Sequence, residues 1–241
     1  MNIVLLEIGN TAVHVEVLNG GQAVYASSLE HEALKGKEEK FVEGLASFQI
    51  FKAVVSSVAP KKGEKILSIL RKKNFDVAEI SDESISPYVP VHVRDGVEVG
   101  IDLLLDVLGV EEKDAIIVDL GTCNKAILKK DGAFEGVAIS PGFEASLKAT
   151  IEETELMKGV MDLPLPKAPI GKDTPSALSS GILLGSIYGL LALTDSLDPN
   201  RTLPRYLCGG LANPFSSYFP GYKVVPSLGL FGLRLLASKI A

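Results

Sequence analysis

Three acidic side chains occupy positions from which a carboxylate can act on a ligand. Glu7 and Asp119 each follow an apolar run and precede a glycine by two residues, in Glu7-Ile-Gly9 and Asp119-Leu-Gly121. An apolar strand of this kind places its acid at the exposed end of a sheet. At this position Glu7 has two open interpretations: its carboxylate holds a metal ion through water, or it is simply solvated. Asp102 lies instead near the beginning of an apolar helix.

Asp102 has two explanations that the sequence leaves open. It precedes Asp106 by four residues, so the two side chains share one helix face. The helix dipole stabilises a carboxylate in the first turn, which is a structural reason for an acid there. The functional explanation is a general base, because an ionised carboxylate accepts a proton from a substrate hydroxyl.

Glycine-rich turns mark three further candidate binding elements. Gly9 permits close approach of a ligand to the backbone, and Asn10 and Thr11 add donors, so this turn suits a phosphate. Gly142 opens a helix whose free amides suit an anion. The pair Gly209-Gly210 follows a short apolar strand and suits a flat group such as adenine. A simple tight turn or helix entry is the structural alternative at the first and last of these positions.

The elements that carry Glu7 and Asp119 repeat one pattern. Asn19-Gly20 follows Glu7 by twelve residues, and Asp131-Gly132 follows Asp119 by twelve. Both dipeptides favour tight hairpin turns. Two copies in one register predict a duplicated α/β domain, with halves at 1–112 and 113–241 and a cleft between them. Further expected elements are strands at 3–9, 12–18, 22–28, 75–80 and 222–226, helices at 37–49, 61–73, 151–162 and 228–240, and a helix capped by Thr174.

Composition narrows the class of protein. A net charge of −6 and a pI near 5.2 argue against a nucleic-acid surface. The apolar run Gly181 to Leu193 is short for a membrane span, and the N-terminus reads directly as a strand, so we expect a cytoplasmic protein. Cys123 and Cys208 suggest free thiols. The histidines His14, His31 and His92 are too scattered for a zinc site.

The order of several short motifs resembles that of the type III pantothenate kinases across almost the whole chain. The motifs are Glu7-Ile-Gly-Asn-Thr11, Ser56-Ser-Val-Ala-Pro60, Val99-Gly-Ile-Asp102, Asp119-Leu-Gly-Thr122, Ile139-Ser-Pro-Gly142, Gly171-Lys-Asp-Thr174 and Gly209-Gly-Leu-Ala212. The resemblance implies an α/β fold of two ribonuclease-H-like lobes, the actin-like ATPase fold, with the nucleotide cleft between them. It also implies a homodimer whose substrate pocket draws on both protomers. From the composition, we expect no nucleic acid or membrane partner.

The resemblance further implies phosphorylation of pantothenate by ATP, the first step of coenzyme A biosynthesis, with Mg2+ and a monovalent cation, K+ or NH4+. Asp102 matches the catalytic base, and Asp119 matches the residue that helps to bind the monovalent cation. Glu7 corresponds to the acid that organises Mg2+. The matched ATP and phosphate contacts are Glu7, Gly9, Asn10, Thr11, His14, Gly121, Thr122, Gly209 and Gly210, and the matched substrate contacts are Gly100, Ile101, Leu103, Gly142 and Thr174.

Several positions depart from the family pattern. Glu7 replaces an aspartate, and Leu103 replaces an arginine beside the catalytic aspartate, so a charge-assisted hydrogen bond of about 1.5–3 kcal/mol is absent there unless another cation such as Arg94 supplies it. Cys123-Asn124-Lys125 replaces Ala-Thr-Thr, Gly136-Val137 replaces a glycine pair, and His14 stands where some members have lysine. Two alternatives therefore stay open: a catalytically degenerate member acting as a binding or transcription-accessory protein, and a kinase of another small hydroxy acid.

Overall fold

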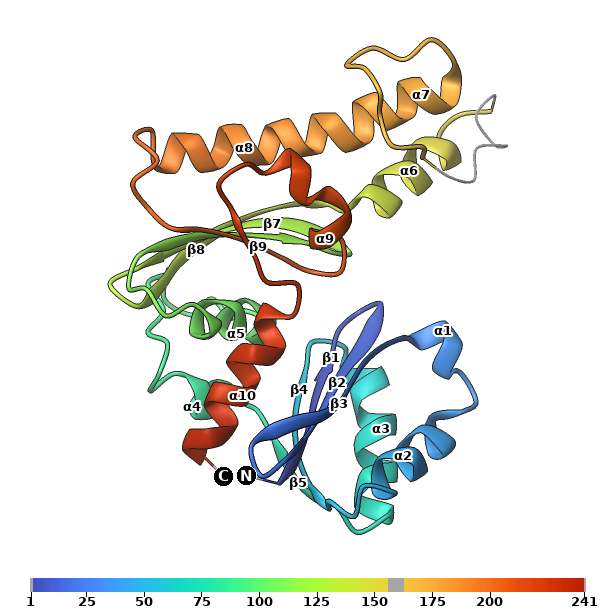
Figure 1. Ribbon diagram of the computed structural model, residues 1–241, viewed down its shortest axis with the longest axis vertical. Helices are drawn as coiled ribbons and strands as arrows, with labels where there is room; N and C mark the ends of the chain where they lie inside the picture. The colour runs from blue at the N-terminus through green and yellow to red at the C-terminus, as the bar shows by residue number, and fades with distance from the viewer. Residues whose placement is uncertain (1, 156–162, 241) are drawn as a thin grey trace. The chain divides into compact units, whose positions relative to one another are not determined.

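A computed structural model describes residues 2–155 and 163–240 of the chain. The chain forms two compact units. Unit 1 comprises Met1–Lys113, Gly132–Phe134 and Ser227–Ala241, and unit 2 comprises Asp114–Asp131 and Glu135–Pro226. Each unit contains one five-stranded sheet with helices, as Figure 1 shows for each.

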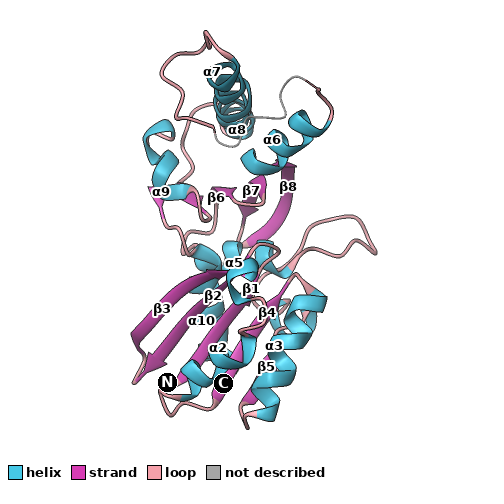
Figure 2. Cartoon of the chain, turned by 90° about the vertical axis from the view of Figure 1, so that its right-hand side faces the viewer, coloured by secondary structure: helices cyan, strands magenta, loops and turns pink. Residues whose placement is uncertain are grey.

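The sheet of unit 1 has the strand order β3-β2-β1-β4-β5, which Figure 2 displays face on. β1 is antiparallel to β2 and parallel to β4, so the hairpin strands lie on one side of β1 and the crossover strands on the other. Apolar residues at every position of β1 except Glu7 make this strand the centre of the sheet. The strands are β1 (Ile3–Ile8), β2 (Ala12–Asn19), β3 (Gln22–Glu30), β4 (Lys52–Ser57) and β5 (Asp76–Glu79).

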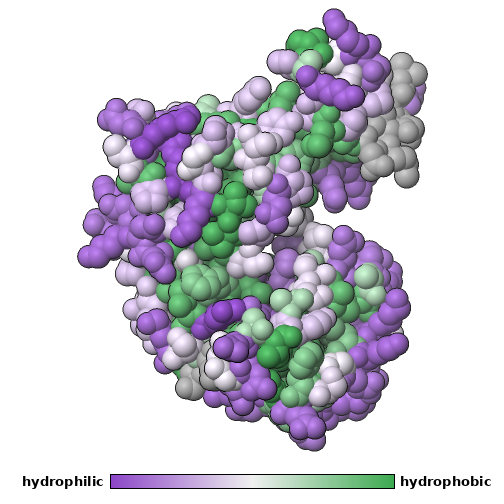
Figure 3. All heavy atoms as spheres, viewed as in Figure 1, coloured by the Kyte–Doolittle hydropathy of each residue, from purple (hydrophilic) through white to green (hydrophobic). Residues whose placement is uncertain are grey.

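Helices cover the sheet of unit 1. Alternate residues of β1, among them Val4 and Leu6, belong to a core with apolar residues of α2 and α3. The outer faces of α2 and α3 carry ion pairs such as Lys65–Glu38 and appear hydrophilic in Figure 3. The helices of unit 1 are α1 (His31–Leu34), α2 (Glu38–Ala46), α3 (Pro60–Lys72), α4 (Asp82–Ile85), α5 (Ile101–Gly109) and α10 (Leu228–Ile240).

The division between the units differs from the predicted halves at the C-terminus. α10 packs along α5 and against β1, so the last helix of the chain belongs to unit 1. Small residues permit this packing, because a β-carbon on Gly109 would lie 2.7 Å from the carbonyl oxygen of Leu228. The sequence predicts the helix at 228–240 correctly, but it does not identify the sheet that the helix covers.

The sheet of unit 2 repeats the arrangement of unit 1. Its order β10-β9-β6-β7-β8 places β6 antiparallel to β7 and parallel to β9, as β1 is to β2 and β4. This repetition confirms the predicted fold of two ribonuclease-H-like lobes. The strands are β6 (Ala115–Leu120), β7 (Cys123–Lys130), β8 (Ala133–Pro141), β9 (Arg205–Cys208) and β10 (Lys223–Val224).

One core of unit 2 joins β6 to the helices. Val118 and Leu120 pack with Phe143, Ile187 and Phe215. The helical elements are α6 (Phe143–Glu152), α7 (Thr174–Ser179), the π-helix η1 (Ser180–Leu184), α8 (Gly185–Leu197), α9 (Ala212–Phe215) and the 3-10 helix η2 (Ser216–Tyr218).

The helix Thr174–Leu197, which runs through α7, η1 and α8, is long and apolar enough to cross a membrane by length and composition alone, and no other helix among residues 2–155 and 163–240 meets that test. The core helix of a soluble protein meets the same test. Ile187 and Leu190 are buried in the core of unit 2. One face of this helix therefore serves the packing of the unit.

Four local predictions need correction. The first hairpin turn has positive φ at Gly20 and Gly21 rather than at Asn19, because adjacent glycines adopt that conformation without steric cost. The helix from Thr174 is capped by Asp173, whose carboxylate accepts the Ser176 N–H at 2.8 Å. α6 ends at Glu152, and 156–162 of the helix predicted at 151–162 lie outside the described residues. The strand expected at 222–226 is limited to β10.

Candidate active site

The turn after β1 is fixed by side chains that sequence reasoning did not select. The N–H of Gly9 donates to Ala12 at 2.9 Å, which closes the turn. Lys62 donates to the Asn10 carbonyl at 2.5 Å, and the His31 Nε2 atom lies 2.8 Å from the Gly9 carbonyl oxygen. Lys62 thus places an ammonium group beside the predicted phosphate-binding turn. In the sequence, the position of Lys62 in the first turn of α3, after the Ser-Ser-Val-Ala-Pro motif, could have indicated this role.

The carboxylates of Glu7 and Asp106 both lie close to Gly229, at the beginning of α10. A β-carbon on Gly229 would lie 2.5 Å from Glu7 Oε1 and 3.3 Å from Asp106 Oδ1. Glu7 is half-buried and pairs in register with His14 on β2, and Asp106 is buried. Mg2+ in kinases is commonly held by one or two carboxylates together with substrate phosphates. These two carboxylates fit that donor set, although no group of three or more metal-ligating side chains occurs among the described residues.

Asp102 lies in the first turn of α5, as its position in the sequence predicts. Gly100 is the N-cap residue, and a β-carbon there would lie 2.6 Å from Asp102 Oδ1. The carboxylate therefore folds back over the helix N-terminus, where the helix dipole stabilises negative charge. Asp102 and Ile101 are half-buried, whereas the Leu103 side chain is only 7% exposed. Leu103 therefore contributes mainly to packing.

In unit 2, residues from three predicted binding elements meet at the end of β6. A β-carbon on Gly209 would collide with Asp119 Oδ1 and with the Leu120 carbonyl oxygen. Gly142 donates its N–H to the Thr122 carbonyl at 3.1 Å, and a β-carbon on it would lie 2.6 Å from that oxygen. Glycine is required at both positions by close backbone approach. The structure thus brings Asp119, Gly121, Thr122, Gly142 and Gly209 together.

Asp119 forms an ion pair within this cluster. Its Oδ2 accepts a hydrogen bond from Lys125 Nζ at 2.6 Å. The two side chains are 12% and 16% exposed. This carboxylate was predicted to help bind a monovalent cation, and a protein ammonium group already neutralises it. The donor set at Asp119 therefore does not fit a further cation at Oδ2.

Three further predicted residues are Thr174, Gly210 and His14. Thr174 is exposed at the first position of α7, and Gly210 is exposed beyond β9. His14 lies on β2 opposite Glu7, near the predicted phosphate-binding turn. Their predicted contacts with substrate or nucleotide stay predictions.

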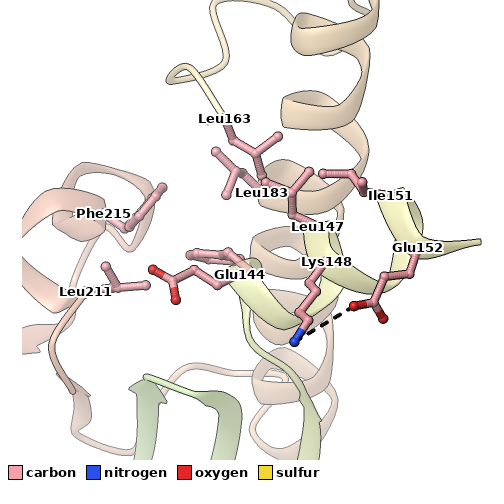
Figure 4. A pocket seen from close by; sticks show the side chains of 10 residues that line it. Glu144, Leu147, Lys148, Ile151, Glu152, Leu163, Leu183, Leu211 and Phe215 are labelled. Carbon is pink, nitrogen blue, oxygen red and sulfur yellow. Dashed lines mark ion pairs between the residues drawn. The ribbon is translucent and has the colours of Figure 1, made fainter. Parts of the chain in front are cut away.

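An apolar groove of about 610 Å³ lies in unit 2. Figure 4 shows leucine and isoleucine side chains of α6 facing Leu163 and Leu183, with Phe215 opposite. Lys148 and Glu152 form an ion pair of 3.8 Å at the rim. The described residues that line this groove include none of the predicted site residues, so it is a feature that motif reasoning did not anticipate.

A family model described as type III pantothenate kinase matches residues 3–195. The chain belongs to that family. The type III pantothenate kinase of Acholeplasma laidlawii is 28% identical over 190 residues, which cover 77% of this chain and 76% of the relative. The match includes Glu7, Asp102, Asp119 and Thr174, so all four lie within the family region.

Solved structures support the fold of this family. A putative 2-dehydro-3-deoxygalactonokinase from Sinorhizobium meliloti has a TM-score of 0.66 at 14% identity and covers 99% of this chain and 96% of its own. A conserved putative Baf family transcriptional activator from Campylobacter jejuni has a TM-score of 0.64 at 19% identity, with 98% of each chain covered. At these identities the likeness shows a shared architecture.

Proposed function

We propose that the chain phosphorylates pantothenate with ATP to give 4'-phosphopantothenate and ADP, the first step of coenzyme A biosynthesis. The observation that carries the proposal is the family match together with the retained carboxylate of Asp102 at the N-terminus of α5. Curated relatives named type III pantothenate kinase support the same activity. Because these relatives are named as kinases of pantothenate, we favour pantothenate over another small hydroxy acid as the phosphate acceptor.

In this proposal Asp102 accepts the proton of the primary hydroxyl of pantothenate. The hydroxyl oxygen then forms a bond to the γ-phosphorus, while the bond between that phosphorus and the β,γ-bridging oxygen breaks and ADP leaves with the electron pair. Phosphoryl transfer of this kind depends mainly on positioned charge and an oriented nucleophile. Asp102 lies at a helix N-terminus, where the helix dipole favours negative charge, and a carboxylate placed there can serve as the base.

The remaining residues bind and orient. The turn Gly9-Asn10-Thr11, with Lys62 beside it, contacts the phosphates, and Glu7 and Asp106 would hold Mg2+. Bound Mg2+ supplies charge neutralisation on the phosphate oxygens. Gly121, Thr122 and the Gly209-Gly210 pair contact the nucleotide, and Gly100, Ile101, Gly142 and Thr174 contact pantothenate. Leu103 and His14 border these sites.

We also propose that the protein acts in the cytoplasm as a homodimer joined along the helix Thr174–Leu197. The glycines Gly181, Gly185 and Gly189 face open space, and a β-carbon on them would meet no atom within 4 Å. Tyr188, Leu193 and Leu197 on the same helix are about half exposed. Small residues beside exposed apolar ones permit close helix packing between two copies. Light scattering after gel filtration should give twice the chain mass of 25.6 kDa.

The deciding experiment is mass-spectrometric detection of phosphopantothenate after incubation with ATP, Mg2+ and pantothenate, beside the Asp102→Asn variant. Product from the wild-type protein alone would support both the activity and the base. The absence of product, with ATP binding still measurable by calorimetry, would favour a binding protein or another acceptor. One observation favours this second candidate. Leu103 is buried and has no hydrogen-bond donor, and it occupies the position of the family arginine.

A further inference from the structure

Lys125 and Asp119 lie directly opposite each other in the β6–β7 hairpin. Side chains at opposed positions of an antiparallel pair project from the same face of the sheet, so the lysine reaches the carboxylate without distortion of either strand. The resulting Nζ–Oδ2 distance is 2.6 Å. Because both side chains are mostly buried, this pair is a built part of the site rather than a solvated surface contact.

The second oxygen of Asp119 also has close neighbours. Oδ1 lies beneath Gly209, where no side chain fits, and 3.6 Å from the place that a β-carbon on Gly121 would occupy. The carboxylate is thus enclosed by the glycine turns on one side and by the lysine ammonium on the other. The Lys125 ammonium offsets the negative charge of Asp119, which lowers the attraction of this carboxylate for a further cation.

We propose that the Lys125 ammonium permanently takes the place of a dissociable monovalent cation at Asp119, so that ATP binding does not depend on K+ or NH4+. The inference rests on the proposed function, because it concerns the same nucleotide site. An ammonium group carries one positive charge and donates up to three hydrogen bonds, as NH4+ donates four. Because the ammonium group is attached to the chain, it is placed when the protein folds, whereas a free cation must be bound from solution.

This assignment gives Lys125 a positioning role: it holds Asp119 and the adjoining Gly121-Thr122 turn in the arrangement that receives the nucleotide. Threonine, which the family carries at this position, has a neutral side chain and cannot bring a positive charge to Asp119. Replacement of Lys125 by threonine should therefore leave the carboxylate ready for an external cation. The replacement of the family's Ala-Thr-Thr by Cys123-Asn124-Lys125 then keeps a positive charge at Asp119.

The test is calorimetric ATP affinity in potassium, sodium and tetramethylammonium chloride at equal ionic strength. We expect the wild-type affinity to agree within about twofold across the three salts. Lys125→Thr should bind ATP at least about tenfold more weakly in tetramethylammonium and recover in potassium. Lys125→Arg should keep the wild-type indifference, since it keeps the charge. Lys130→Ala, an exposed lysine on the same strand, is the matched control.

A second readout needs no nucleotide. The thermal unfolding midpoint of Lys125→Thr should rise with K+ relative to tetramethylammonium, whereas the wild-type midpoint should not. If the threonine variant does not fold, Lys125→Met serves in its place. K+-dependent ATP binding by the wild type, or a threonine variant indifferent to cations, would overturn the inference. Failure of the wild type to bind ATP in any salt would instead overturn the proposed function, and the midpoints would still decide the cation question.

Discussion

Arg234 on α10 forms two hydrogen bonds with the Glu16 carboxylate on β2, one of them from Nε at 2.7 Å. The two residues are 218 positions apart in the chain. Glu16 is buried, and the Arg234 side chain is one-third exposed. This bidentate pair joins the last helix to the first hairpin and gives a chemical reason for the assignment of α10 to unit 1.

Removal of either partner should destabilise unit 1. We expect Arg234→Met and Glu16→Gln each to lower the free energy of unfolding by about 1.5–3 kcal/mol, because a largely buried charged group loses its hydrogen bonds. Urea denaturation measures the change. Lys148→Met, which removes an exposed ion pair with Glu152, should change it by less than about 1 kcal/mol. Equal effects of the three substitutions would contradict the assigned importance of the Arg234–Glu16 pair.

The double glycine after β9 offers a matched pair of substitutions. Gly209 has a φ of +89° and no space for a β-carbon, whereas Gly210 has open space. Gly209→Ala should cost about 2–5 kcal/mol of unfolding free energy through backbone strain and collision with Asp119. Gly210→Ala should stay within about 0.5 kcal/mol. Thermal denaturation of the two variants side by side checks this, and similar midpoints would show that the turn adjusts.

Replacement of the proposed base separates catalysis from folding. Asp102→Asn should lower turnover roughly 100-fold or more, because the amide cannot accept the hydroxyl proton. Its unfolding midpoint should remain close to the wild-type value, since asparagine keeps the size of the side chain. Steady-state kinetics with pantothenate as the varied substrate measures the loss. An unchanged turnover number would remove Asp102 from the mechanism.

Acid should weaken unit 2 through Asp198. Hydrogen bonds from the Leu203 N–H, the Thr202 N–H and the Thr202 hydroxyl, with the nearby charge of Arg205, hold the pKa of this carboxyl below its ordinary value. A lowered folded-state pKa contributes stability above the unfolded pKa, near 3.9, and this contribution is lost as the pH falls through the folded pKa. Unfolding midpoints measured from pH 7 to pH 3 should fall less steeply for Asp198→Asn. Parallel curves for the two proteins would argue against this linkage.

Local chemistry in the sequence was sufficient for much of the fold. The apolar runs that end in Glu7 and Asp119 predict the central strands, and Asp131-Gly132 predicts a turn in which both residues have positive φ. These features depend on a few neighbouring residues, so they can be read without knowledge of the rest of the chain. The ordered motifs likewise identify the family to which the chain belongs.

Only the tertiary structure showed which residues from distant positions in the chain contact the predicted site residues and the first sheet. Lys62 beside Asn10, Gly229 against Glu7, Gly209 against Asp119 and α10 on the first sheet all join residues that are far apart in the chain. Lys125 is only six residues from Asp119, but their contact depends on the hairpin register, and a shift of one residue would turn the lysine to the other face. Sequence therefore determined the strands, the turns and the family. Packing and register determined which charges meet, because a side chain's partners are set by the folded geometry rather than by its own chemistry.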